Sequence, residues 1–94
     1  MKVLWSPEAL DDLGAAVDYL AERSPPAAEK LVVGITALVE RLATEPLDGP
    51  EHALANGDRV RGWPFAPFRI YYSRTPDALL VVRIYHQRRE PITR

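Results

Sequence analysis

Apolar residues recur at steps of three and four positions early in the chain. One such stripe consists of Leu10, Leu13, Val17 and Leu20. This spacing places side chains on one face of a helix. Ser6-Pro7 offers a capping hydroxyl and a proline suited to the first helical position, so we expect a helix from there to about Arg23-Ser24.

A second helical stripe follows a short turn at Ser24-Pro25-Pro26. Its members are Ala28, Leu31, Ile35, Leu38 and Leu42, widened by Val32 and Val39. The pattern predicts a helix from about Pro26 to Ala43, in which Gly34 permits a close approach by a neighbour. Because the turn is so short, the two helices should form an antiparallel hairpin.

Later in the chain the pattern changes to the alternation that is typical of β-strands. After a short apolar start at Val3–Trp5 and an expected loop over 47–58, the predicted strands are Arg59–Trp63, Phe68–Arg74 and Leu79–His86. The last two should form a hairpin. The position of the first strand in the sheet stays open.

Alternation also assigns side chains to the two faces of this sheet. The set expected against the helices is Phe68, Ile70, Tyr72, Leu80, Val82 and Ile84. The open face would then carry Arg69, Tyr71, Arg83 and Tyr85. We therefore expect an α+β fold, with a short N-terminal strand and an antiparallel helix pair packed on one face of a small antiparallel sheet (β-α-α-β-β-β).

Length and composition restrict the class of protein. With 94 residues, the chain should form one domain over 1–94. It has no cysteine and two histidines, His52 and His86, which is a poor basis for a zinc site, so no metal or cofactor is expected. There is no signal-peptide pattern and no apolar stretch near ~20 residues, so we expect a cytoplasmic protein without a membrane partner.

The charges are sorted along the chain. Residues 1–58 hold eleven acidic and four basic residues, a net charge of −7. Residues 59–94 hold eight arginines against Asp77 and Glu90, a net charge of +6. Such asymmetry indicates a surface that meets an anion, either nucleic acid or an acidic protein partner.

Four segments, in this order, carry a family resemblance. They are Leu4-Trp5-Ser6-Pro7-Glu8-Ala9, Tyr19-Leu20-Ala21-Glu22-Arg23-Ser24-Pro25, Phe68-Arg69-Ile70-Tyr71-Tyr72 and Val82-Arg83-Ile84-Tyr85-His86-Gln87-Arg88-Arg89. Together they resemble the RelE/ParE superfamily of toxins from bacterial type II toxin–antitoxin systems, with the ParE-like branch favoured. The resemblance implies a toxin that is neutralised by a cognate antitoxin.

The superfamily resemblance implies two different targets. ParE-like members poison DNA gyrase, whereas RelE-like members cut mRNA on the ribosome. The chain is slightly acidic overall, and a nuclease that grips a phosphate backbone is usually basic, which favours gyrase. A third interpretation is a non-toxic remnant that only binds its antitoxin.

A nuclease would need convergent acid, base and cationic groups. The candidates are Arg69, His86, Arg83 and Tyr85, with a carboxylate only from Glu45 or Glu51. In the alternation of the last strand His86 falls on the buried side, which also fits a structural histidine at the edge of the core. Whether the chain is an enzyme is therefore left open.

Contacts with the target or the antitoxin are expected from the basic and aromatic residues of the last strands. The set is Arg59, Arg61, Arg69, Tyr71, Arg83, Tyr85, Arg88 and Arg89. Trp63, Phe65 and Phe68 are expected to pack in the core rather than to stack on bases. Leu47 or Leu54 would be available to dock an antitoxin helix.

Overall fold

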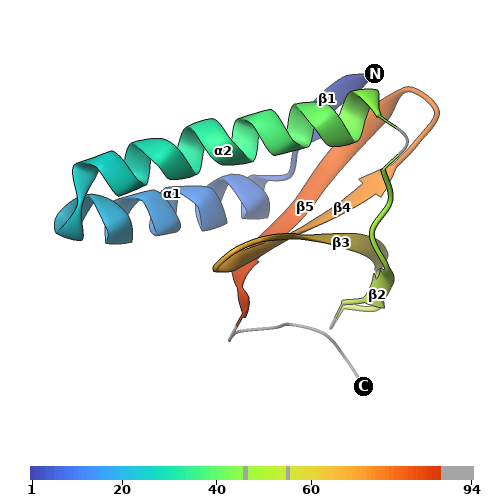
Figure 1. Ribbon diagram of the computed structural model, residues 1–94. Helices are drawn as coiled ribbons and strands as arrows, with labels where there is room; N and C mark the ends of the chain where they lie inside the picture. Colours follow the sequence, from blue (N-terminus) through green and yellow to red (C-terminus); the bar gives the residue numbers. More distant parts are fainter. Residues whose placement is uncertain (46, 55, 88–94) are drawn as a thin grey trace.

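The structure is a computed structural model that describes residues 1–45, 47–54 and 56–87. Its elements in chain order are β1 (Lys2–Trp5), α1 (Pro7–Arg23), α2 (Pro25–Thr44), β2 (Glu51–Ala53), β3 (Arg59–Phe65), β4 (Phe68–Arg74) and β5 (Ala78–His86). Both helices lie on the same side of the sheet (Figure 1). The expected α+β arrangement is confirmed.

The two serines predicted at the helix starts act as caps. The Ser6 hydroxyl accepts a hydrogen bond from the Ala9 amide at 3.0 Å, and the Ser24 hydroxyl accepts one from the Ala27 amide at 3.3 Å. Each cap satisfies an amide that has no partner within the helix. Because Ser24 ends α1 and begins α2, the chain reverses without a longer loop, and the helices form the predicted hairpin (Figure 1).

The five strands form one sheet in the order β1-β5-β4-β3-β2. All neighbouring pairs are antiparallel except β1 and β5, which are parallel, so the sheet is mixed rather than wholly antiparallel. Strand β1 thus occupies the edge next to the last strand of the chain. At the opposite edge lies β2, within the segment 47–58 that was expected to be a loop.

The main hydrophobic core lies between the helices and the sheet. From α2 it takes the predicted stripe: Ala28, Leu31, Ile35, Leu38, Val39 and Leu42 are all buried. From α1 it fully buries only Ala9, while Leu13, Val17 and Leu20 pack against it in part. The prediction was wrong for Leu10, 54% exposed, and for Val32, 40% exposed, because each lies at the margin of its stripe, facing solvent.

The prediction for the faces of β5 was partly wrong because the strand contains a β-bulge. Tyr71 pairs with Arg83 but its neighbour Tyr72 pairs with Val81, so Val82 is an extra residue in the ladder. A bulge interrupts the simple alternation of side chains. Leu79, Val81 and Ile84 therefore join the core under the helices, and Leu80 and Val82 line the other face.

Gly34 allows strand β3 to approach α2. A Cβ atom at this position would lie 2.4 Å from Cζ of Phe65. The close approach predicted at Gly34 is confirmed, and the neighbour is a phenyl ring of the sheet rather than α1. Trp63 and Phe65 pack against the core, as expected.

Candidate functional site

The face of the sheet turned away from the helices, here called the helix-free face, has a small core of its own. Leu54, Val60 and Tyr71 are buried there, and Val82 and Tyr85 pack against them. The expectation that Tyr71 is exposed was wrong, since its exposed fraction is 0%. Leu54, 5% exposed, is likewise packed by its own chain rather than held ready for a partner.

Aromatic rings form a row across three strands of the helix-free face. The ring centroids of His52 and Tyr71 are 5.6 Å apart, and those of Tyr71 and Tyr85 are 6.1 Å apart, both edge to face. The guanidinium of Arg83 lies 4.3 Å from the centre of the Tyr85 ring. Burial raises the pKa of the Tyr85 phenol above its ordinary value.

Arg83 is engaged by α1 rather than free to bind a partner. Its Nε and Nη2 atoms donate to the two carboxylate oxygens of Asp12 at 2.8 and 3.0 Å, and the Ile84 amide donates to the same carboxylate at 2.9 Å. The hydrogen bond to Asp12 raises the pKa of Arg83. The carboxylate therefore fastens α1 to β5 just after the bulge, a role that sequence reasoning missed.

Three further arginines in the second half of the chain also pair with early carboxylates. Arg59 pairs with Glu51 at 2.5 Å, which lowers the pKa of that carboxyl group. Arg61 and Arg74 both approach Asp48, at 3.9 and 3.0 Å. The arginines are thus spread over several ion pairs, which weakens the expectation of one shared cationic surface.

Arg74 also stabilises the fold through hydrogen bonds to backbone carbonyls. Its Nη1 atom donates to the Leu42 carbonyl and its Nη2 atom to the Leu47 carbonyl, both at 2.6 Å. These bonds hold the C-terminal turn of α2 and the following loop against β4. Leu47 itself packs in part against the main core.

Arg69 differs from the other arginines in the described part of the sheet, Arg59, Arg61, Arg74 and Arg83. It has no ion pair with any residue in the ranges that the structure describes. Its Cδ atom lies 3.4 Å from the position that a Cβ on Gly62 would take, and the imidazole of His52 lies 2.9 Å from the same point. The bare backbone of Gly62 thus lets Arg69 and His52 converge on the helix-free face. Arg88 and Arg89 lie outside the described residues.

The four candidate nuclease residues do not form one group, because His86 lies on the opposite face from Arg69 and Tyr85. His86 pairs with Phe68 in the ladder and contacts its ring edge to face at 5.6 Å, on the side of the main core. Arg69 and Tyr85 lie on the opposite face, and Arg83 is bound to Asp12. The carboxylates considered as a base are engaged as well: Glu45 pairs with Arg41, and Glu51 pairs with Arg59.

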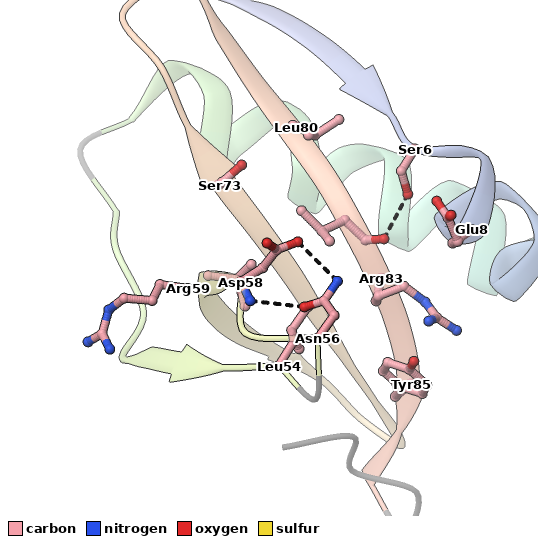
Figure 2. Close-up of a pocket in the computed structure, with 12 residues that line it drawn as sticks. Ser6, Glu8, Leu54, Asn56, Asp58, Arg59, Ser73, Leu80, Arg83 and Tyr85 are labelled. Atoms are coloured by element: carbon pink, nitrogen blue, oxygen red, sulfur yellow. Dashed lines mark hydrogen bonds between the residues drawn. The ribbon is translucent and has the colours of Figure 1, made fainter. Parts of the chain in front are cut away.

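A groove of about 610 Å³ crosses the helix-free face (Figure 2). Its floor is formed by apolar side chains of β3 and β5, one wall by the start of α1, and the other by the connection between β2 and β3. The residues of this helix-free groove are Ser6, Glu8, Leu54, Asn56, Asp58, Arg59, Val60, Ser73, Leu80, Val82, Arg83 and Tyr85. Sequence reasoning did not find it, because β2 and the bulge in β5 were both missed.

The helix hairpin carries exposed apolar residues on more than one side. Exposed fractions are 54% for Leu10, 57% for Tyr19, 40% for Val32 and 66% for Val33. Leu10 and Tyr19 are nine residues apart on α1, so they lie on opposite sides of that helix.

Comparison with known families assigns the chain. The model of the "ParE toxin of type II toxin-antitoxin system, parDE" family matches residues 3–91. The chain belongs to this ParE toxin family. The predicted RelE/ParE resemblance and its ParE-like branch are thereby confirmed.

A solved structure supports the fold of this ParE-family chain. It is described as the chromosomal ParDE TA system from P. aeruginosa, and it matches with a TM-score of 0.66 and 24% sequence identity. The match covers 92% of this chain and 95% of that chain. No curated protein matches the sequence.

Two kinds of feature are absent from the described residues. No three histidine, aspartate or glutamate side chains in the described ranges gather as metal ligands would. Neither helix among those residues is long and apolar enough to cross a bilayer.

Proposed function

We propose that this ParE-family toxin acts by binding DNA gyrase and that a cognate antitoxin neutralises it. The family match over residues 3–91 carries the proposal. The placement of His86 on the face opposite to Arg69 and Tyr85 supports a mechanism of binding rather than bond cleavage. A toxin of this kind would be cytoplasmic, because gyrase acts on DNA in the bacterial cytoplasm.

Arg69 is the basic residue best placed to contact the target. It lies on β4 at the helix-free face without an ion pair to the described residues, whereas Arg59, Arg61 and Arg83 stabilise the fold. An unpaired guanidinium can form new charge-assisted hydrogen bonds with a carboxylate or a phosphate at little cost.

The antitoxin would wrap around the helix hairpin. Leu10 and Tyr19 of α1 and Val32 and Val33 of α2 expose apolar surface on the hairpin, and α1 fully buries only Ala9 within its own chain. Burial of such residues by an amphipathic segment that folds on binding would stabilise the complex.

Two experiments test the target: expression of the toxin in a bacterium, and a supercoiling assay with purified proteins. We expect filamentous growth, DNA-damage signalling and inhibition of supercoiling by purified gyrase. Arg69→Ala should weaken that inhibition while Lys30→Ala, an exposed control on α2, leaves it unchanged. Cleaved mRNA codons with normal supercoiling would overturn the gyrase assignment, and normal growth would support a remnant that only binds antitoxin.

The second candidate function is a ribosome-dependent endoribonuclease, which one observation favours. His52 and Arg69 approach each other over Gly62 on the same face, so an imidazole does accompany the unpaired guanidinium. In this case His52→Ala would abolish mRNA cleavage, and His86→Ala would not.

The antitoxin surface has its own test. Val33→Glu places a charge on the outer side of α2, where its side chain contacts little of its own chain. We expect toxicity to remain and neutralisation by the cognate antitoxin to be lost. The exposed control Thr36→Glu on the same helix would show whether any added charge suffices.

A further inference from the structure

The helix-free groove combines an apolar floor with carboxylates on two walls. Leu80, Val82 and Val60 contribute to the floor, Glu8 lies at the start of α1, and Asp58 lies on the β2–β3 connection (Figure 2). The groove volume of about 610 Å³ lies within the range of ligand sites. A ligand in the groove would contact apolar and acidic surface together.

The basic residues of the groove do not neutralise these walls. Arg59 points out of the groove, where it pairs with Glu51 (Figure 2). Arg83 is paired with Asp12, and the negative charge of Glu8 adds to the hydrogen bond from Asp12 in raising the pKa of Arg83. The Asp58 carboxylate accepts a hydrogen bond from the uncharged Asn56 side chain at 3.1 Å and forms no ion pair with the residues that the structure describes. The walls therefore carry excess negative charge.

We infer that the helix-free groove binds a short basic and apolar peptide segment of a partner protein. A lysine or arginine side chain fits these walls because its aliphatic stem packs on apolar surface while its cation reaches a carboxylate. A leucine or valine next to it would lie over Leu80 and Val82. This goes beyond the proposed function, since the chemistry of the groove walls is independent of whether gyrase is the target.

Charge distinguishes this surface from the one around Arg69. A partner that reaches Arg69 must present an anion, whereas a segment in the groove must present a cation. The chain thus offers two complementary contacts on one side of its sheet, and a partner that alternates acidic and basic segments would engage both.

Fluorescence anisotropy with a labelled eight-residue peptide of alternating leucine and lysine tests the inference on the full chain. We expect saturable binding that weakens as salt rises. The double variant Glu8→Gln/Asp58→Asn should bind about tenfold more weakly, since two ion pairs of this kind together account for roughly that factor. The matched control Glu22→Gln/Glu29→Gln removes two exposed carboxylates outside the groove and should bind like the parent chain.

A second peptide and a variant of the groove floor complete the test. A leucine–glutamate peptide should not bind, and Leu80→Lys, which puts a cation on the floor, should abolish binding while circular dichroism stays native. Equal loss in both double variants, or tighter binding of the glutamate peptide, would overturn the inference. Sedimentation that shows a dimer dissolved by Glu8→Gln/Asp58→Asn would also overturn it, because the occupant would then be a second copy of the chain.

Discussion

The two faces of the sheet are closed in different ways. On one face, both helices and side chains from β1, β3, β4 and β5 form the main core. On the other, the connection from β2 to β3 covers only Leu54, Val60 and Tyr71 and leaves the groove and Arg69 beside them. Most of the buried apolar surface that stabilises the fold thus lies on one face, and the candidate binding chemistry lies on the other.

A core truncation under the helices should have the largest effect. Ile35 has an exposed fraction of 0%, so Ile35→Ala should lower the free energy of unfolding by about 2–5 kcal/mol. Leu80→Ala on the helix-free face should cost less, since Leu80 is only half-buried. Urea unfolding followed by tryptophan fluorescence measures both, and equal costs would contradict the comparison.

Two glycines test the contact between α2 and the sheet. Gly34→Ala puts a Cβ atom 2.4 Å from Cζ of Phe65, and overpacking of this kind costs about 1–3 kcal/mol. Gly14→Ala, on the outer side of α1 where nothing lies within 4 Å, should instead stabilise by up to about 1 kcal/mol. Thermal unfolding shows whether each substitution raises or lowers the stability of the fold. Stabilisation by Gly34→Ala would show that the Phe65 ring moves aside freely.

The carboxylate that joins α1 to β5 should have an intermediate effect. Asp12→Asn replaces a charged acceptor of three hydrogen bonds and should cost about 1–3 kcal/mol. The exposed neighbour Asp11→Asn is the control and should change stability little. If chemical denaturation finds the two variants alike, Arg83 is less firmly held than its geometry indicates, and it returns to the set of arginines available to a partner.

The exposed pair of Glu51 and Arg59 should have the smallest effect. Because Arg59 lowers the pKa of Glu51 in the folded chain, the pair stabilises the fold above the ordinary carboxyl pKa. This contribution is lost as pH falls through the folded pKa. Stability profiles of the parent chain and Glu51→Gln should therefore differ slightly near neutrality and converge in acid. An NMR titration that finds the ordinary pKa for Glu51 would contradict this explanation, because Arg59 would then not favour the charged carboxylate.

Periodicity predicted the helix-covered face well because burial there follows regular elements. Ser6 and Ser24 marked the helix starts, and the α2 stripe from Ala28 to Leu42 entered the core at the predicted spacing. Phe68, Ile70 and Tyr72 also face the helices as alternation requires. These features depend on local sequence alone.

The helix-free face was predicted poorly because tertiary contacts determine it. The bulge at Val82 reverses the faces of the residues before it, and no local signal marks it. Tyr71 is buried in a small core with Leu54, which follows a strand in a segment that looked like a loop. The partners of the arginines, such as Asp12 for Arg83, lie far away in sequence, so alternation alone cannot show which guanidinium groups are engaged.

The parallel pairing of β1 with β5 affects when the protein can fold during synthesis. Lys2 lies opposite Ala78, and Trp5 lies opposite Val81, so β1 cannot pair until this distant segment has been synthesised. Contacts between such distant segments form slowly, since a long loop must close first. The nascent chain therefore cannot complete its sheet before the segment around Val81 has left the ribosome, and until then β1 lacks its neighbouring strand.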